Sequence, residues 1–319
     1  MHKQLLAFDF GGTKLSAATT SAEELASARP NWTSKRRVFS PPGADAAYDL
    51  QNMTALGQEL LGAQRPSAIG VSFGGPADFS SGRVLRSDHV PGWQNVPLQA
   101  ALEETFGVPV RIDNDANVGA LGEAKLGAGR RTPDLFYITI STGVGGGLIL
   151  NGRLWRGLHG LAGEIGHVVV DPGGPTCLCG KRGCVERLAS GPYMSQDARQ
   201  ELARSPENGR ILADLAGGKP ITGEIVARAA VAGDEIARKI LLRGARALGL
   251  GIGNTANLLD IPLFVLGGGV TRAGSLWWDE VRRSARSTAL AGIKFEVVPA
   301  ALADDAPLWG AAFLAQSLL

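Results

Sequence analysis

The stretch LLAFDFGGTKLSAATT (5–20) and a second stretch, LFYITISTGVGGGLIL (135–150), share one plan. In each, an apolar strand ends in a polar residue, a turn rich in glycine and threonine follows, and a second strand leaves the turn. Such a turn exposes several backbone N–H groups, and nests of N–H groups bind anions. One glycine-rich hairpin is a weak signal, because tight turns need glycine anyway. Two of them, 130 residues apart, indicate two related half-domains that face one phosphate chain.

Apolar runs bounded by turn residues predict strands along the whole chain, and helical periodicity predicts helices. The predicted strands are 5–10, 68–73, 108–113, 135–140, 147–151, 167–170, 263–267 and 295–299. The predicted helices are 49–63, 97–106, 115–126, 186–204, 223–231, 234–258, 275–288 and 306–318. This mixture indicates an α/β protein.

Composition limits the classes of function. The 319 residues are about two domains' worth of chain, and the formal charge of +2 argues against binding to nucleic acid or to an acidic membrane surface. No segment reaches the ~20 apolar residues of a membrane span, and the first residues lack the apolar core of a secretory signal. Three cysteines without such a signal favour a cytoplasmic chain that uses thiolates for metal binding or chemistry.

Two common nucleotide-binding motifs are missing from the sequence. There is no G-x-x-x-x-G-K-[ST], and both GVGGGL (143–148) and GLGIGN (249–254) miss the third position of G-x-G-x-x-G. Glycine nevertheless accounts for 44 of the 319 residues, roughly twice its average usage. These glycines cluster at the ends of predicted strands, where the backbone would approach a ligand.

Six motifs together resemble those of the ROK family, which comprises bacterial sugar kinases and related repressors. They are DFGGTK (9–14), DNDANVGALGE (113–123), STGVGGG (141–147), GEIGHVVV (163–170), CLCGKRGCVE (177–186) and VLGGGV (265–270). The resemblance implies the duplicated actin/hexokinase-like (ribonuclease H-like) fold, with two lobes around a cleft. It implies a small lobe over 1–118 to which the last helix (306–318) returns, and a large lobe over 119–305 with a zinc-binding loop. It also implies a homodimer.

The resemblance implies ATP as the phosphoryl donor, together with Mg²⁺. Asp9 ends a strand beside a glycine turn, and magnesium prefers one or two carboxylates plus substrate oxygens. A turn-capping carboxylate is the alternative for Asp9 alone. The other residues that the resemblance assigns to the nucleotide are Gly11, Gly12, Thr13, Lys14, Thr142, Gly143, Gly267, Gly268 and Gly269.

The chemistry is expected in IDNDANVGALGE (112–123). Phosphoryl transfer to a hydroxyl needs a carboxylate that accepts the hydroxyl proton, and the resemblance assigns this role to Asp115. The alternative is that one of Asp113, Asn114 and Asp115 only caps the following helix. By the same resemblance, the sugar is bound by Gly74, Gly75, Asn114, Asp115, Glu164, His167 and Glu186.

All three cysteines lie in HVVVDPGGPTCLCGKRGCVE (167–186). His167, Cys177, Cys179 and Cys184 have the number and type of ligands of a closed structural Zn²⁺ site. The alternative is three buried thiols and a core histidine. A metal here would brace Glu164 and Glu186, which are close to the ligands in sequence.

The predicted activity is ATP-dependent phosphorylation of a hexose 6-hydroxyl, with glucose as the leading acceptor and N-acetylglucosamine or N-acetylmannosamine as alternatives. A sugar-sensing repressor of the same family would need an N-terminal helix-turn-helix domain, whereas Asp9 comes almost at once. A non-catalytic sugar-binding protein is opposed by the presence of both Asp9 and Asp115. His89 stands where many members have asparagine, so the sugar stays open, as does ATP against polyphosphate as donor.

Overall fold

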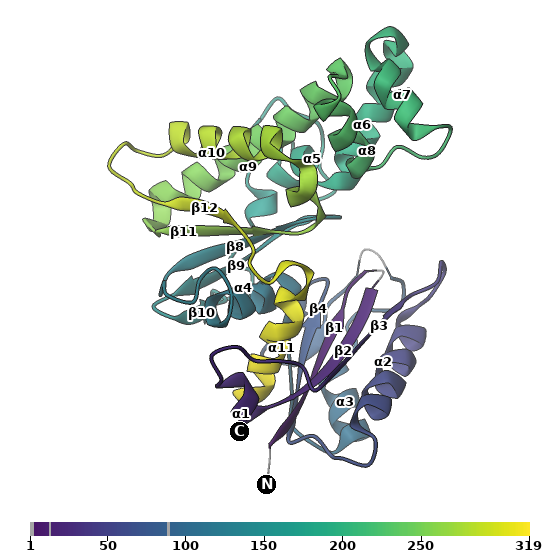
Figure 1. Cartoon of the computed structure of the whole chain (residues 1–319), viewed down its shortest axis with the longest axis vertical. Coiled ribbons are helices and arrows are strands. Elements are labelled where there is room, and N and C mark those ends of the chain that lie inside the picture. Colours follow the sequence, from purple (N-terminus) through teal and green to yellow (C-terminus); the bar gives the residue numbers. More distant parts are fainter. Residues whose placement is uncertain (1–2, 13, 88–89) are drawn as a thin grey trace. The chain divides into compact units, whose positions relative to one another are not determined.

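Two compact units make up the chain, and the computed structural model describes residues 3–12, 14–87 and 90–319 (Figure 1). The first unit comprises Met1–Pro133, Gly147–Leu161 and Asp304–Leu319, and the second comprises Asp134–Gly146 and Ala162–Ala303. The elements of the first unit are β1 (Gln4–Phe10), β2 (Lys14–Ser21), α1 (Ala22–Leu25), β3 (Ser34–Phe39), α2 (Ala46–Leu61), β4 (Ala68–Phe73), β5 (Ala77–Asp78), β6 (Arg83–Val84), α3 (Leu98–Phe106), β7 (Val110–Asn114), α4 (Asp115–Lys125), β10 (Arg153–Trp155) and α11 (Ala306–Gln316).

The elements of the second unit are β8 (Leu135–Ile140), η1 (Ile165–His167), α5 (Val185–Ala189), α6 (Gly191–Arg204), η2 (Pro206–Gly209), α7 (Arg210–Ala216), α8 (Gly223–Val231), α9 (Glu235–Leu259), β11 (Leu263–Gly267), η3 (Gly269–Ala273), α10 (Ser275–Thr288) and β12 (Glu296–Pro299). Two elements, β9 (Val144–Leu150) and η4 (Ala303–Asp305), cross the boundaries between the units.

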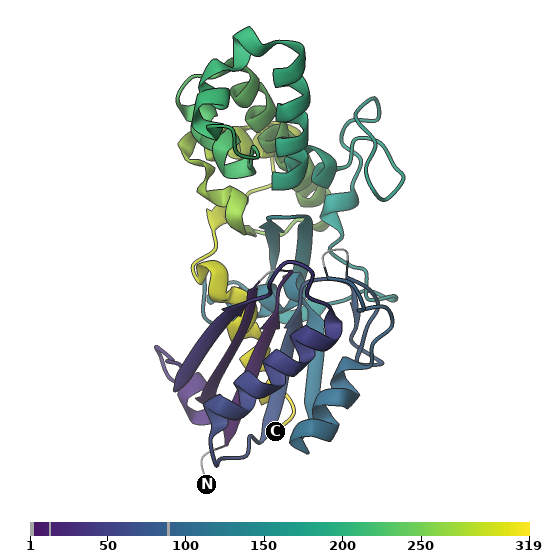
Figure 2. The ribbon, with the colours of Figure 1, turned by 90° about the vertical axis from the view of Figure 1, so that its right-hand side faces the viewer.

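The sheet of the first unit has the strand order β3-β2-β1-β4-β7. β1, β4 and β7 are parallel, and β2 and β3 run antiparallel to their neighbours. Helices α2 and α3 cover one face and α11 covers the other (Figures 1 and 2). Phe8 lies in the core between the sheet and α2. On the other face strand β4 has Gly70, where a Cβ atom would lie only 1.8 Å from the carbonyl oxygen of Ala311, so α11 sits directly on the sheet.

Helix α4 belongs to the first unit, because it packs closely on α11. A Cβ atom at Gly122 would lie 2.3 Å from the carbonyl oxygen of Ala306, and one at Gly310 would lie 1.8 Å from that of Val118. Only glycine allows two helix backbones to approach so closely. The observed units therefore differ from the predicted division at residue 118, since residues 119–133 and 147–161 lie in the first unit.

The second five-stranded sheet has the order β10-β9-β8-β11-β12. β8, β11 and β12 are parallel, and β10 is antiparallel to β9. In each sheet the first three strands follow one another outward from the centre, and two parallel strands complete the other side. The predicted internal repeat is thus real, and its two hairpins are β1–β2 and β8–β9.

Two sequence-based expectations about elements were wrong. Residues 167–170 form no strand: a short 3₁₀ helix ends at His167, and a single bridge joins Val169 to Cys184. The expected helix 186–204 is two helices, α5 and α6, because the chain is extended at Ser190 (φ −74°, ψ 151°). Pro192 favours this break, since proline is accepted in the first turn of a helix, whereas in a continuous helix it would lack the N–H that bonds the carbonyl four residues earlier.

Candidate active site

Asp9 is the second-last residue of β1 in the first unit, close to the glycine turn. Its Oδ1 accepts a hydrogen bond of 2.8 Å from Ser72 Oγ on the neighbouring strand β4. Burial raises the pKa of Asp9 to about 6, an effect that the Ser72 hydrogen bond and the nearby Arg37 and Lys14 partly oppose. A carboxylate that is costly to ionise on its own is well suited to a cation ligand, because a bound cation favours the charged form.

The turn after Asp9 is closed by backbone hydrogen bonds. Gly11 N–H donates to the carbonyl of Lys14 over 2.9 Å, and Gly74 N–H donates to the carbonyl of Phe10 over 2.7 Å. The Lys14 ammonium lies 3.7 Å from Asp304. Gly12 stands between these residues, whereas Thr13 and also His89 lie outside the described residues. The structure thus places Asp9, Gly11, Gly12, Lys14 and Gly74 at one end of the sheet.

We expect the raised pKa of Asp9 to appear in the pH dependence of stability. The folded-state pKa of about 6 exceeds the ordinary value of 3.8, so the folded chain holds this proton more tightly than the unfolded chain. The stabilisation is complete below the unfolded value and is lost as the pH rises through the folded value. Asp9→Asn is neutral at every pH, so it should gain roughly 1–3 kcal/mol over wild type between about pH 4 and pH 7. Urea unfolding of both proteins without Mg²⁺ measures this, and a constant difference across the range would contradict it.

The β7–α4 junction carries Asp113, Asn114 and Asp115. Asn114 is the N-cap of α4: its Oδ1 accepts from Ala116 N–H over 2.9 Å, and its Nδ2 donates to the carbonyl of Gly75 over 3.0 Å. Of the three residues considered as helix caps, Asn114 is therefore the one that caps α4, and Asp115 is the first residue of the helix. The first turn of a helix is a favourable position for a carboxylate, because the N–H groups there carry partial positive charge.

Asp113 is buried, and it holds this junction in place. Its carboxylate accepts from Asn114 N–H (2.8 Å), from Asn117 Nδ2 (2.9 Å) and from Arg156 Nε (2.7 Å). The Arg156 guanidinium also lies 3.5 Å above the ring of Phe79. Sequence patterns did not single out Arg156, because it is 43 residues away from Asp113 along the chain.

Glu186 lies beside the second hairpin, within the second unit. Its Oε2 accepts from Val144 N–H over 2.9 Å, and a Cβ atom at Gly143 would lie 2.8 Å from the same oxygen. The hairpin turn itself is closed by Ser141 N–H, which donates to the carbonyl of Gly143 over 2.9 Å. The structure therefore brings together Glu186 and the predicted phosphate-binding turn of Thr142 and Gly143.

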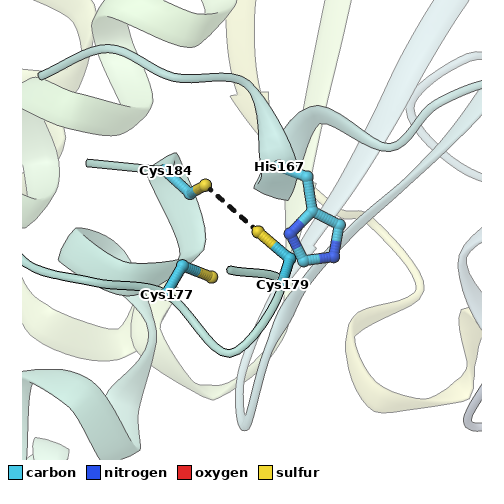
Figure 3. Close-up of side chains that lie close together, drawn as sticks. All are labelled: His167, Cys177, Cys179 and Cys184. Carbon is cyan, nitrogen blue, oxygen red and sulfur yellow. Dashed lines mark hydrogen bonds between the residues drawn. The ribbon is translucent and has the colours of Figure 1, made fainter. Parts of the chain in front are cut away.

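The predicted metal ligands converge in the second unit (Figure 3). His167, Cys177, Cys179 and Cys184 each offer one ligand atom, and these atoms all lie within 4.8 Å of one another. The sulfurs of Cys179 and Cys184 are 3.5 Å apart. Gly180 and Gly183 have φ values of 85° and 66°, which allow the sharp turns between the cysteines.

The protonation chemistry of this cluster fits a metal ion. Burial raises the pKa of the Cys184 thiol to about 12, whereas the hydrogen bond from Lys181 N–H lowers that of Cys179 to about 7. His167 Nδ1 is buried and has no hydrogen-bond partner among the described residues; in Figure 3 it points toward the sulfur of Cys179. The other ring nitrogen, Nε2, lies 4.0 Å from Glu164 Oε2. A buried ring nitrogen without a partner is costly unless it binds something, and a cation would hold Cys184 as a thiolate.

A cavity of about 1150 Å³ lies entirely within the second unit. Thr142 and Gly269 line it, so the structure brings two of the predicted nucleotide residues together. Gly267 and Gly268 pack instead against β8, where a Cβ atom would lie 2.5 Å from the Tyr137 hydroxyl and 2.3 Å from the Ile140 carbonyl oxygen.

Much of the cavity wall comes from helices α6 and α8 and was not predicted. The unpredicted polar and charged residues are Ser141, Ser195, Arg199, Thr222, Glu224, Arg228 and Arg272. No local pattern marks these residues. The starts of the two helices meet through glycine, since a Cβ atom at Gly223 would lie 3.0 Å from the Cα atom of Gly191.

Comparison with known proteins places the chain among sugar kinases. The sequence profile of the ROK family matches residues 5–318. Glucokinase from Streptomyces coelicolor is 33% identical over 317 residues, which are 97% of this chain and 96% of the relative. N-acetylmannosamine kinase from Shigella flexneri is 34% identical over 315 residues, 98% of each chain. The crystal structure of a ROK family glucokinase from Streptomyces griseus in complex with glucose and AMPPNP is 34% identical, has a TM-score of 0.82 and covers 98% of this chain and 99% of that chain. These similarities confirm the predicted duplicated α/β fold.

Proposed function

Because the chain belongs to the ROK family, we propose that it transfers the γ-phosphoryl group of ATP to the 6-hydroxyl of a hexose, with glucose as the leading acceptor. One observation carries this proposal: over nearly its whole length the chain is similar to a glucokinase whose structure contains glucose and the ATP analogue AMPPNP. A coupled assay with a panel of hexoses, and with ATP or polyphosphate as donor, tests it. Lack of phosphorylation of every hexose would contradict it and favour a sugar-sensing role.

The reaction joins the sugar oxygen to the γ-phosphorus as the bond to the β-phosphate oxygen breaks. We propose Asp115 as the general base that accepts the hydroxyl proton during this attack. The Asn114 side chain has two N–H groups, of which one bonds the Gly75 carbonyl; the other is available to a sugar hydroxyl. Gly75 and Gly74 allow the sugar ring to approach the backbone.

In each unit the glycine turn is proposed to bind phosphate, and in the second unit the cavity is proposed to bind the rest of the nucleotide. The cavity of about 1150 Å³ exceeds the range of roughly 300–1,000 Å³ that is usual for small-ligand sites. Asp9 would hold Mg²⁺, which shields charge on the transferred phosphoryl group when bound. The N–H groups of Gly12 and Gly143 would donate to phosphate oxygens. Gly11, whose N–H closes the turn, would let the phosphates approach its backbone, and Lys14 would add a positive charge.

Thr142→Val should raise the KM for ATP by about 10–100-fold and leave the KM for the sugar nearly unchanged. Valine keeps the shape of threonine but lacks its hydroxyl, and a hydrogen bond to a charged group is worth about 1.5–3 kcal/mol. Thr288→Val is the matched control, because among the described residues the Thr288 hydroxyl bonds only the Ser284 carbonyl in α10. An ATP KM equal to that of the control would remove Thr142 from the phosphate site.

We propose that His167, Cys177, Cys179 and Cys184 bind one structural Zn²⁺. The buried His167 Nδ1 and the three converging sulfurs support this set. Glu164 stands three residues before His167, and Glu186 stands two residues after Cys184. The metal would thus steady the two carboxylates that are proposed to bind sugar hydroxyls, and His167 Nε2 remains directed toward Glu164.

An N-acetylhexosamine kinase is the second candidate. The 34% identity to N-acetylmannosamine kinase equals, within a percentage point, the identity to glucokinase. The hexose panel therefore includes glucose, N-acetylglucosamine and N-acetylmannosamine, and the highest kcat/KM assigns the acceptor.

We also propose that the chain forms a homodimer through the second unit. Leu258 and Leu290 are exposed by 83% and 69%. The two leucines lie near each other, because Leu290 N–H donates to Asn257 Oδ1 over 2.8 Å. Sedimentation of the purified protein measures its oligomeric state.

A cytoplasmic location is a further part of the proposal. No helix in the described part of the chain combines the length and apolar character needed to cross a membrane.

A further inference from the structure

A buried ion pair lies beside the cysteine loop (residues 176–184). Arg187 on α5 donates to both carboxylate oxygens of Asp197 on α6, over 2.8 and 3.0 Å, and the two side chains are only 7% and 9% exposed. Arg243 on α9 donates to the same carboxylate. Because desolvation offsets much of the attraction in a buried pair, such a pair adds little net stability. Its contribution is the geometry that it fixes.

The fixed geometry includes the backbone on both sides of Cys177. Arg187 Nε donates to the carbonyl of Thr176 over 3.2 Å. Leu178 N–H donates to the Tyr193 hydroxyl over 3.1 Å, and the ring of Tyr193 lies 4.6 Å below the Arg187 guanidinium. Side chains from α5 and α6 therefore hold the residues that precede and follow this cysteine.

The same pair is connected to the other end of the loop. Cys184 is the N-cap of α5, a helix of five residues, so it lies within one turn of Arg187. Val185 N–H donates to the carbonyl of Val168 over 3.0 Å, next to His167. None of these contacts involves a metal. Together they hold three of the four proposed ligands, namely Cys177, Cys184 and His167.

We propose that Arg187, Asp197 and Tyr193 are positioning residues that hold the cysteine loop in its metal-binding shape before zinc arrives. The proposal rests on the zinc site proposed above. A preformed loop binds metal more tightly because binding then does not have to order the chain. Removal of these contacts should weaken zinc binding without removing any ligand.

The test is the zinc affinity of the full-length protein, measured by competition with a chromophoric chelator. Replacement of residues that orient metal ligands typically costs 10–100-fold in affinity, and we expect a loss of about this size for Asp197→Asn. Tyr193→Phe removes one hydroxyl and should cost about 2–10-fold, the value of a single net hydrogen bond. Glu201→Gln on the same helix is the matched control and should bind zinc like wild type, because within the described part of the chain Glu201 pairs only with the exposed Arg204.

A second readout reports the shape of the loop without metal. Lys181 and Arg182 are exposed in the loop, so trypsin can cut there when the loop opens. In zinc-depleted protein we expect faster cleavage at these two sites in Asp197→Asn and Tyr193→Phe than in wild type or Glu201→Gln. Saturating zinc should suppress the difference.

The outcomes separate the two proposals. If wild type binds zinc and both variants match it in affinity and in loop cleavage, the positioning role is overturned while the zinc site stands. If wild type binds no zinc, the zinc site itself is wrong, and the positioning role fails with it. An equal loss of ATP affinity in both variants would assign the three residues to the packing of the whole unit and would also overturn the proposal.

Discussion

Asp115→Asn is expected to lower kcat for hexose phosphorylation by about 10²–10⁴-fold, the usual cost of removing a general base. Asparagine has nearly the shape of aspartate but cannot accept the proton of the attacking hydroxyl. The cap of α4 comes from Asn114, so the helix and the fold should persist. The KM for the sugar should change far less than kcat, because the neighbouring hydrogen-bonding groups remain. Steady-state kinetics with glucose and ATP measure both constants.

Asp260→Asn is the control for this experiment. Asp260 is an exposed residue with φ 47° at the end of α9, a conformation that asparagine adopts as readily as aspartate. It should therefore keep wild-type turnover and stability. Turnover of Asp115→Asn close to that of the control would show that Asp115 is not the base.

Cys179→Ser should cost the chain its zinc and, with it, much of its sugar affinity. Structural zinc binds with about 10–16 kcal/mol, so one of four ligands accounts for roughly 3 kcal/mol, or about 100-fold in affinity. Glu164 and Glu186 would lose their support, and the KM for the sugar should rise. The KM for ATP should change less, because none of the four ligands lies in a nucleotide turn or lines the cavity. Metal analysis and separate titrations of sugar and nucleotide measure each effect.

Leu178→Ser is the matched change at the adjacent position. Leu178 is 89% exposed and offers no ligand atom, so this variant should keep its metal and its sugar affinity. A metal-free wild type with full activity would refute the zinc site. Equal losses of sugar and nucleotide binding in Cys179→Ser would mean that the metal supports the whole unit.

Local sequence patterns predicted best the strands that are buried along almost their whole length and the helices with a regular apolar face. The strands at 68–73, 135–140 and 263–267 and the helices at 223–231 and 275–288 begin and end where the structure has them. Pro192, two residues after Ser190, also indicated the helix break in the sequence. The helical periodicity continues on both sides of the break, and for this reason a single helix was predicted. The expected strand at 167–170 failed for a different reason. Val168 and Val169 are apolar but exposed, by 37% and 39%, and no neighbouring strand pairs with this segment beyond one bridge.

The sequence by itself determined the repeated hairpins, the aspartates near the strand ends and the cluster of one histidine and three cysteines. These features depend on residues that are close together in the chain, and there spacing and side-chain chemistry are sufficient. The contacts that tune them come from far along the chain: Ser72 on Asp9, Arg156 on Asp113 and the Arg187–Asp197 pair beside the cysteines. The same holds for the cavity wall from α6 and α8. Only the tertiary structure decided these, because which distant side chains meet depends on how sheets and helices pack, and no local pattern encodes that packing.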